Sequence, residues 1–456
     1  MIVSLRERLE AVSGSDVAPS QETAAPPTAL RSSRAYQELK SHLHQVLLDR
    51  IDLEAMETLS PDRLRLELRG MVETLLREEN VVVNELERRN LVRDIQYEML
   101  GLGPLEPLLA DPTISDILVN NSQQVYVERR GKIELTDVTF VDDAHLMKII
   151  DKIVSRVGRR IDESSPMVDA RLPDGSRVNA IVPPLALDGP VLSIRRFAAV
   201  PLTMSNLIEY KTIVPEMAQL LDALTRAKMN ILISGGTGSG KTTLLNILSS
   251  FIPHNERIIT IEDAAELQLQ QPHVVRLETR PSNIEGRGEV TQRALVRNAL
   301  RMRPDRIILG EVRDAEAFDM LQAMNTGHEG SMGTVHANSP REALTRLENM
   351  LGMAGMNSPA KVMRSQIASA IHVVVQVARL TDGKRKVISV QEITGMEGDM
   401  ITMQEIFHFR QTGIAESGAV QGFFAATGIR PRFSERLRAF GVPLGEALFD
   451  PLRRFD

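Results

Sequence analysis

The chain contains no cysteine among its 456 residues. This absence excludes disulfide bonds, thiolate catalysis and every zinc site built on cysteine ligands. Long apolar runs are missing as well, because no stretch approaches 18 consecutive apolar residues and charged residues interrupt the segment 1–12. We therefore expect neither a membrane span nor a secretory signal core, and we expect a protein that is made and kept in the cytoplasm.

An excess of positive charge is also lacking. The sequence has 54 Lys and Arg residues against 60 Asp and Glu residues, a formal net charge of −6, and a pI near 6.0. This balance argues against a generally basic nucleic-acid binder, so we expect no direct contact with nucleic acid. The length and the 43% hydrophobic content are ordinary for a globular protein of two or three domains.

The sequence does contain a phosphate-binding loop. Residues 235–242 read GGTGSGKT, and they stand between a strand-like run at 229–234 and a helix-like run at 242–249. Glycines let the backbone N–H groups converge on phosphates, Lys241 would reach the β- and γ-phosphates, and Thr242 would hold Mg²⁺. The alternative is a glycine-rich turn that binds nothing. The predicted contacts to ATP in this segment are Gly235, Gly236, Thr237, Gly238, Ser239, Gly240, Lys241, Thr242 and Thr243.

Two acids and a histidine follow later strand-like runs. Glu262 ends the run 257–262, where a carboxylate could position Mg²⁺ or water, although acids also favour a helix start. Glu311 follows the run 306–310, with Gly310 in place of the usual Asp, and would orient or activate the attacking water and contact the metal. His336 would hydrogen-bond phosphate or water. The alternative is an exposed acid at a strand end for Glu311 and a structural role for His336.

Arginines would supply the cations that a phosphoryl transition state needs. Four of them precede the nucleotide region, near its boundary, and would be arginine fingers if their domain folds over the nucleotide of its own or a neighbouring subunit. Otherwise they are ordinary surface or salt-bridge residues. These four are Arg171, Arg177, Arg195 and Arg196.

The spacing of apolar residues and turns predicts the organisation of the chain. Apolar residues recur at helical spacing from about residue 36 to 99, which predicts a helical bundle, and Ser60 is expected to cap one of its helices. The α+β domain is expected to have strands at 114–119, 124–128 and 138–141 and a helix at 143–157. Strands alternate with helices from 228 to 395, which indicates a mostly parallel α/β sheet. The predicted segments are a disordered leader at 1–34, the helical bundle at 35–104, the α+β domain at 105–200, a linker at 201–214, the nucleotide domain at 215–395 and an extension at 396–456.

Together these motifs resemble the secretion ATPase superfamily of type II and type IV secretion and type IV pili. Its four boxes correspond to the phosphate loop, the acids at Glu262, Gly310–Arg313, and a segment ending in His336. Within the superfamily the chain is most similar to CpaF-type ATPases of Tad (Flp) pilus assembly, through 279–286, 300–306 and 395–399. The lack of the four-cysteine zinc module found in many related ATPases favours this group or the type IV secretion group.

The resemblance implies a RecA-like P-loop domain, preceded by a PAS-like α+β sensor domain and a helical bundle. It implies a homohexamer that uses ATP and Mg²⁺, with sensor-domain arginines reaching the phosphates; Arg177 with Arg195 or Arg196 match best. It also implies docking on platform proteins at the cytoplasmic face of the inner membrane, where hydrolysis would drive pilus assembly. The alternatives are a type IV secretion ATPase, a nucleotide-switched scaffold with little hydrolysis, and a nucleic-acid translocase.

Overall fold

The computed structural model describes residues 34–50, 60–129, 131–196, 201–282, 287–355 and 358–455. The chain forms two compact units, Met1–Ala199 and Val200–Asp456. Among the helices described, none is long and apolar enough to cross a membrane. The expected leader lies, apart from its last residue, outside the described residues.

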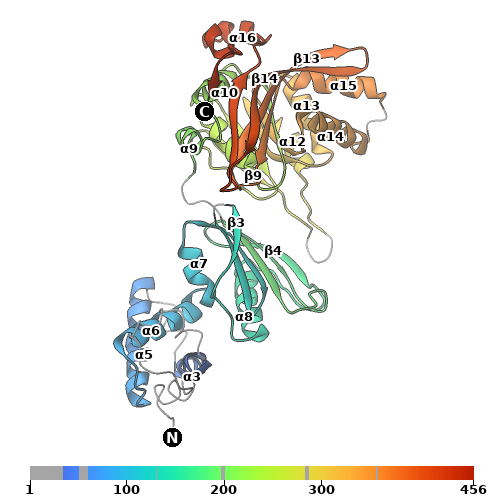
Figure 1. Cartoon of the computed structure of the whole chain (residues 1–456). Helices are drawn as coiled ribbons and strands as arrows, with labels where there is room; N and C mark the ends of the chain where they lie inside the picture. The colour runs from blue at the N-terminus through green and yellow to red at the C-terminus, as the bar shows by residue number, and fades with distance from the viewer. Residues whose placement is uncertain are drawn as a thin grey trace. The chain divides into compact units, whose positions relative to one another are not determined.

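Helices occupy the start of the first unit, where the apolar spacing predicted them (Figure 1). They are α3 (Arg34–Arg50), α5 (Pro61–Glu78) and α6 (Glu85–Leu100), and they share a small core that includes Leu43, Leu75 and Leu91. Ser60 stands at the N-cap of α5, but its side chain makes no capping hydrogen bond. Pro61 at the first helical position fixes the helix start instead.

The rest of the first unit is a six-stranded antiparallel sheet in the order β3-β2-β1-β6-β5-β4. Its strands are β1 (Ile114–Asn121), β2 (Gln124–Arg129), β3 (Lys132–Leu135), β4 (Met167–Arg171), β5 (Arg177–Ile181) and β6 (Val191–Arg195). Short helical segments η1 (Gly103–Leu105) and α7 (Glu106–Ala110) precede it, and α8 (Asp143–Arg156) packs its apolar side into the same core. The PAS-like character of this unit stays a prediction.

The strand predicted at 138–141 is wrong. The third strand is Lys132–Leu135. It pairs with β2, with Leu135 opposite Tyr126 and Lys132 opposite Arg129. Phe140 is buried in the core, but its backbone N–H donates to Ser122 rather than to a ladder. A buried aromatic residue in a loop produces the same apolar signal as a short strand, so the sequence pattern alone did not separate the two.

The second unit is built on a ten-stranded sheet in the order β16-β15-β14-β13-β12-β7-β11-β10-β8-β9. Strands β12, β7, β11, β10, β8 and β9 run parallel, and the remaining strands pair antiparallel. The parallel strands are β7 (Ile231–Gly235), β8 (Ile258–Glu262), β9 (Val274–Glu278), β10 (Arg306–Val312), β11 (Met332–His336) and β12 (Val373–Arg379). The strands predicted for the nucleotide domain are thereby confirmed, as is its RecA-like α/β class.

Helices cover both faces of this sheet (Figure 1). One apolar core lies under α9 (Met204–Glu209), α10 (Pro215–Arg226), α11 (Lys241–Ser249) and α16 (Ser434–Ala439). The other lies under α12 (Gln292–Ala299), α13 (Glu316–Asn325), α14 (Pro340–Met353) and α15 (Ala360–Ala370). Both faces of the central strands are therefore buried, which explains their continuous apolar sequences.

Two expected segments differ in the structure. The expected linker 201–214 contains α9, and Leu207, Ile213 and Val214 are buried in the core of the second unit. The expected C-terminal extension, 396–456, continues the sheet from the end of β13 (Arg385–Glu397) through β14 (Met400–Ile414), β15 (Val420–Ala426) and β16 (Arg454–Phe455), with η2 (Glu446–Phe449) before the last strand. Strands β13 and β14 form a long antiparallel ribbon, and its many polar residues hide the strand period.

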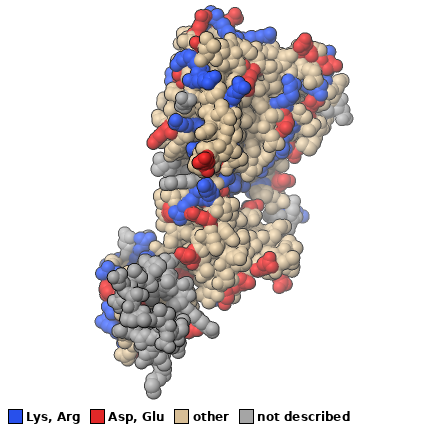
Figure 2. All heavy atoms as spheres, in the orientation of Figure 1, with Lys and Arg blue, Asp and Glu red and all other residues tan. Residues whose placement is uncertain are grey.

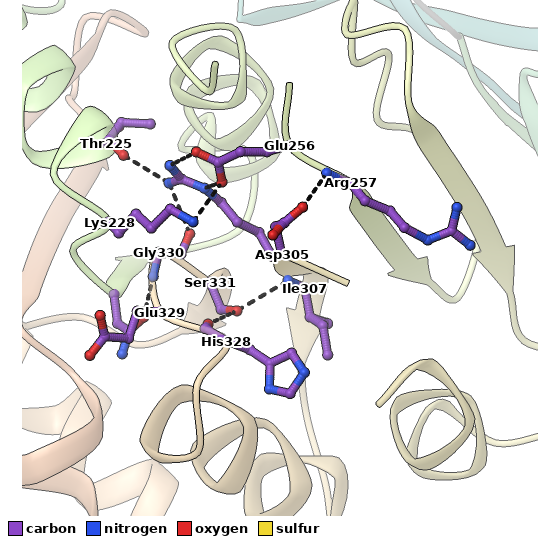
Figure 3. A network of polar contacts seen from close by, with 12 residues as sticks. Thr225, Lys228, Glu256, Arg257, Asp305, Ile307, His328, Glu329, Gly330 and Ser331 are labelled. Carbon is purple, nitrogen blue, oxygen red and sulfur yellow. Dashed lines mark hydrogen bonds and ion pairs between the residues drawn. The ribbon is translucent and has the colours of Figure 1, made fainter. Parts of the chain in front are cut away.

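A buried polar network joins the amino ends of the central strands (Figure 3). The Arg306 side chain is fully buried and pairs with Glu256 through two hydrogen bonds of 2.7 and 3.0 Å. It also donates to the carbonyl oxygens of Thr225 and Gly330, at 2.8 and 3.3 Å. A methyl group at Gly330 would lie 2.6 Å from the guanidinium, so only glycine fits there. This network connects the amino ends of the central strands, at the opposite end of the sheet from the phosphate loop.

Acid should destabilise the second unit through His372. Burial lowers the pKa of His372 to about 4, and Arg436 adds to the effect; its Nδ1 accepts the Asn230 N–H at 2.9 Å. Because the folded pKa lies below the unfolded value, this stabilisation is complete above about pH 6.5 and is lost toward pH 4, by about 2 kcal/mol at pH 5. In calorimetry at about pH 7.5 and pH 5, the wild type should lose more stability on acidification than His372→Asn. Equal losses would contradict the assignment.

Candidate nucleotide site

The phosphate loop connects β7 to α11. Gly238 and Gly240 have φ angles of 67° and 97°, which favour glycine because other residues clash there. At Gly235 a Cβ would lie 2.5 Å from the carbonyl oxygen of Val377 on the neighbouring strand, so that position also needs glycine. The residues expected to contact ATP thus form a tight loop, with Thr242 and Thr243 in the first turn of α11.

Polar contacts inside the loop converge on one carbonyl group. The Lys241 ammonium donates to the carbonyl oxygen of Gly236 at 3.0 Å, and the Ser239 hydroxyl donates to the same oxygen at 2.8 Å. The Ser239 backbone N–H points to it as well, at 3.4 Å. Three donors thus gather around the Gly236 oxygen, and donors of this kind would suit the oxygen atoms of a phosphate chain.

Strand order brings three predicted residues to the same edge as the loop. In the sheet, β11 lies next to β7, β10 next to β11, and β8 next to β10. His336 at the end of β11 pairs with Gly235, so it stands beside the start of the loop. Glu311 lies near the end of β10 and Glu262 ends β8. Because parallel strands share one carboxyl edge, all four motifs meet there.

Glu311 belongs to an ion-pair network that the sequence motifs did not indicate. Arg313 donates to Oε2 of Glu311 at 2.6 Å and to Oδ2 of Asp263 at 3.1 Å. The hydrogen bond to Glu311 raises the pKa of Arg313. The carboxylate side chain is 27% exposed, so it is accessible while its orientation is fixed by the guanidinium. The available signal was an arginine two positions after the acid, directly beyond the strand end.

Glu262 is placed differently from a solvent-facing metal ligand. It is 2% exposed, and its Oε2 accepts the backbone N–H groups of Glu266 and Leu267 at 2.7 and 3.0 Å. Burial raises the pKa of Glu262 to about 7, because the two N–H bonds offset only part of the desolvation. Its Oε1 has no hydrogen-bond partner within the described part of the chain. In this arrangement Glu262 organises the turn after β8, and its catalytic and metal roles stay predictions.

The position of Glu262 explains the glycine that replaces the usual aspartate. A Cβ at Gly310 would lie 2.8 Å from Cγ of Glu262. The Gly310 carbonyl oxygen also accepts a 2.7 Å hydrogen bond from the Thr334 hydroxyl on β11. A side chain at position 310 would therefore displace the buried glutamate, so the two residues depend on one another.

The predicted arginines gather on one face of the first unit's sheet. Arg171 pairs with Arg177, and Arg177 pairs with Arg195, on three neighbouring strands. Residues paired directly across antiparallel strands project from the same face, and α8 covers the opposite one. Arg195 donates to Asp116 at 3.1 Å. The row thus places three arginines and Asp116 side by side across β4, β5, β6 and β1.

Arg196 does not join this row. Its Nη1 donates to the carbonyl oxygens of Asp111 and Ile114, which ties the end of β6 to the segment before β1. A guanidinium occupied by backbone carbonyl groups has fewer donors left for phosphate. The Arg195 guanidinium is likewise occupied, by Asp116, so the choice between Arg195 and Arg196 as the partner of Arg177 stays a prediction.

Comparison with known proteins identifies the family. Residues 98–429 match the family described as Type II/IV secretion system protein, and residues 36–100 match Type II secretion system protein E, N-terminal domain. A putative conjugal transfer protein of Mycobacterium tuberculosis strain H37Rv is 40% identical over 313 residues, which cover 67% of this chain and 88% of the relative. The type IV secretion system protein PtlH of Bordetella pertussis is 36% identical over 318 residues, covering 63% and 93%.

Among solved structures, the VirB11 ATPase of the Brucella suis type IV secretion system is 30% identical, covering 63% of this chain and 95% of that chain, with a TM-score of 0.34. The family match spans well over half of the sequence and includes the phosphate loop, Glu311 and His336. The chain therefore belongs to the type II/IV secretion system protein family and is an ATPase of that family.

Proposed function

We propose that this ATPase is the motor of a Tad (Flp) type IV pilus, and that ATP hydrolysis moves pilin subunits at the inner membrane. The observation that carries the proposal is the carboxyl edge of the second unit's sheet, where the phosphate loop, His336 and Glu311 adjoin one another. A second support is the arginine row on a separate unit, because a motor needs a part that responds to the phosphates.

The chemistry of this site would be hydrolysis by an activated water. The water oxygen would attack the γ-phosphorus, the bond from the γ-phosphorus to the bridging oxygen would break, and ADP and phosphate would leave. Glu311 would orient the water and accept its proton, while Lys241 would stabilise negative charge on the β- and γ-oxygens. His336 would hydrogen-bond the γ-phosphate or the water.

The residues at the loop fit a magnesium ion bound together with phosphates. Within the described residues, no group of three or more His, Asp and Glu side chains forms a metal cluster. Mg²⁺ needs none here, because it is commonly held by one or two protein oxygens, phosphate oxygens and water. The Thr242 hydroxyl would hold it, with Glu311 as a further oxygen donor and Glu262 offering its Oε1, because its Oε2 accepts the N–H groups of the turn after β8. When bound, the ion would neutralise charge on the phosphate oxygens.

Movement would come from the arginine row. ATP would draw Arg177 and Arg195, with Arg171 beside them, to its phosphates in the same or a neighbouring subunit of a homohexamer, and hydrolysis would release them. In this proposal residues 105–200 form the sensor domain, which responds to the bound nucleotide. Such a cycle would act on inner-membrane platform proteins from the cytoplasmic side.

A type IV secretion ATPase is the second candidate, because the conjugal transfer protein and PtlH carry names from that setting. The two can be separated genetically in a strain whose own gene is deleted. Restoring the wild-type gene, but not a Lys241→Ala allele, should restore surface pili. Loss of protein or DNA export with normal pili would favour the second candidate. Full complementation by Lys241→Ala would overturn both and favour a scaffold.

A further inference from the structure

The hairpin that joins β12 to β13 packs against the phosphate loop of the same unit. Arg385, the first residue of β13, donates its Nε–H to the carbonyl oxygen of Gly238 at 2.9 Å. A Cβ at Gly240 would lie 3.4 Å from Cδ of Arg385, so the arginine runs along the loop. Arg379, the last residue of β12, brings its Nη1 to 3.4 Å from a Cβ placed on Gly238. Two guanidinium groups thus reach one point of the loop.

The contact with Gly238 controls the next N–H group. A carbonyl group and the following N–H belong to one planar trans peptide and point in opposite directions. The Gly238 oxygen faces Arg385, whereas the Ser239 N–H faces the Gly236 carbonyl, the side on which the Lys241 ammonium also lies. Holding the oxygen therefore holds the Ser239 N–H on the side of the loop where the Lys241 ammonium lies.

The hairpin itself is anchored at three places. Asp382 in its turn accepts the backbone N–H of Val420 at the start of β15, at 3.1 Å. The Lys386 ammonium donates to the carbonyl oxygen of Lys211 and lies 5.2 and 5.3 Å from the ring centroids of Phe409 and Phe424. Its neighbour Val387 donates to Thr212 at 2.9 Å. The hairpin that carries Arg379 and Arg385 is thus fixed by contacts to β14, β15 and residues 211–212.

We propose that this hairpin is a cis-acting clamp of the nucleotide site. Arg385 is a positioning residue that keeps the Ser239 N–H aimed at the phosphates, and Arg379 adds positive charge beside it. The proposal rests on the nucleotide site described under the proposed function. A loop held in this way binds the ground state and the transition state of ATP equally, so the clamp acts on nucleotide affinity rather than on the chemical step.

The test compares steady-state ATP hydrolysis by the full-length wild type and Arg385→Gln. A hydrogen bond from a charged donor corresponds to about a tenfold change in affinity, so the KM for ATP and the Kd for ADP should rise about tenfold. The kcat should stay within about threefold. Arg385→Lys, which keeps the charge, should give a KM between the two.

Lys384→Gln is the matched control, because Lys384 is an exposed cation on the same hairpin. It should leave the KM unchanged. An unchanged KM in Arg385→Gln, or a fall in kcat alone, would overturn the clamp. If Arg385→Gln does not fold, Arg379→Gln provides the second measurement, with an increase in the KM expected and an unchanged KM contradicting the proposal. Lys241→Ala distinguishes a failure of the clamp from a failure of the nucleotide site. Full turnover in that variant would refute the nucleotide site itself.

Discussion

Replacing Glu311 with glutamine is expected to lower ATP turnover at least about 100-fold while nucleotide affinity changes little. An amide cannot accept a proton from water, and a general base typically contributes a factor of about 10² to 10⁴. The substitution preserves shape, so Arg313 keeps an oxygen to which it can donate in place of the 2.6 Å contact. Single-turnover hydrolysis and ADP binding, measured on the same preparation, separate chemistry from affinity.

A matched substitution serves as the control for this measurement. Glu397→Gln changes an exposed glutamate near the end of β13 and should leave turnover unchanged. If Glu311→Gln retained full turnover, Glu311 would not be the base, and the proposed chemistry would need another residue. Weakened ADP binding with normal single-turnover rates would likewise contradict the assigned role.

Replacing Arg306 with methionine is expected to destabilise the second unit by about 3 to 5 kcal/mol. Removing one partner of a buried ion pair leaves the other charge without compensation. Among the described residues, Lys228, 3.5 Å away, would be the cation left beside Glu256, and the carbonyl groups of Thr225 and Gly330 would lose a donor (Figure 3). For a unit of this size, the melting temperature should fall by roughly 5 to 15 °C.

Scanning calorimetry suits this measurement, because the chain has no tryptophan to report unfolding by fluorescence. The double variant Arg306→Met with Glu256→Leu should lose less stability than the sum of the two single variants, since it leaves no unpaired charge. Arg410→Met, on an exposed position of β14, is the control and should change stability little. A loss below about 1 kcal/mol in Arg306→Met would show that the pair is dispensable.

Exposed charges contribute less to stability than the buried groups described above. On the visible face of the second unit, Lys and Arg side chains are interspersed with Asp and Glu (Figure 2). Exposed pairs of this kind contribute little to stability and are screened by salt. The informative charges are instead the buried ones, such as Arg306 with Glu256.

The sequence predicted those helices, strands and loops whose pattern depends on neighbouring residues alone. The phosphate loop, its flanking strand and helix, and the strands before Glu262 and Glu311 depend on neighbouring residues only, and the structure confirms these elements. Prediction failed at 138–141, where a buried loop residue resembles a strand, and for 201–214 and 396–456 the sequence indicated only a linker and an extension. There the burial of Leu207 or of β14 depends on partners far away in the chain.

By itself, the sequence determined the class of chemistry, because a glycine-rich loop with its lysine and threonine needs no distant residue to present N–H groups to a phosphate. Only the tertiary structure decided which groups surround that loop. Pairing of strands remote in sequence placed His336 beside Gly235, aligned Arg171, Arg177 and Arg195, and brought Arg385 to Gly238. Such neighbours follow from strand order and packing, which depend on the burial of the whole sheet and not on any local pattern.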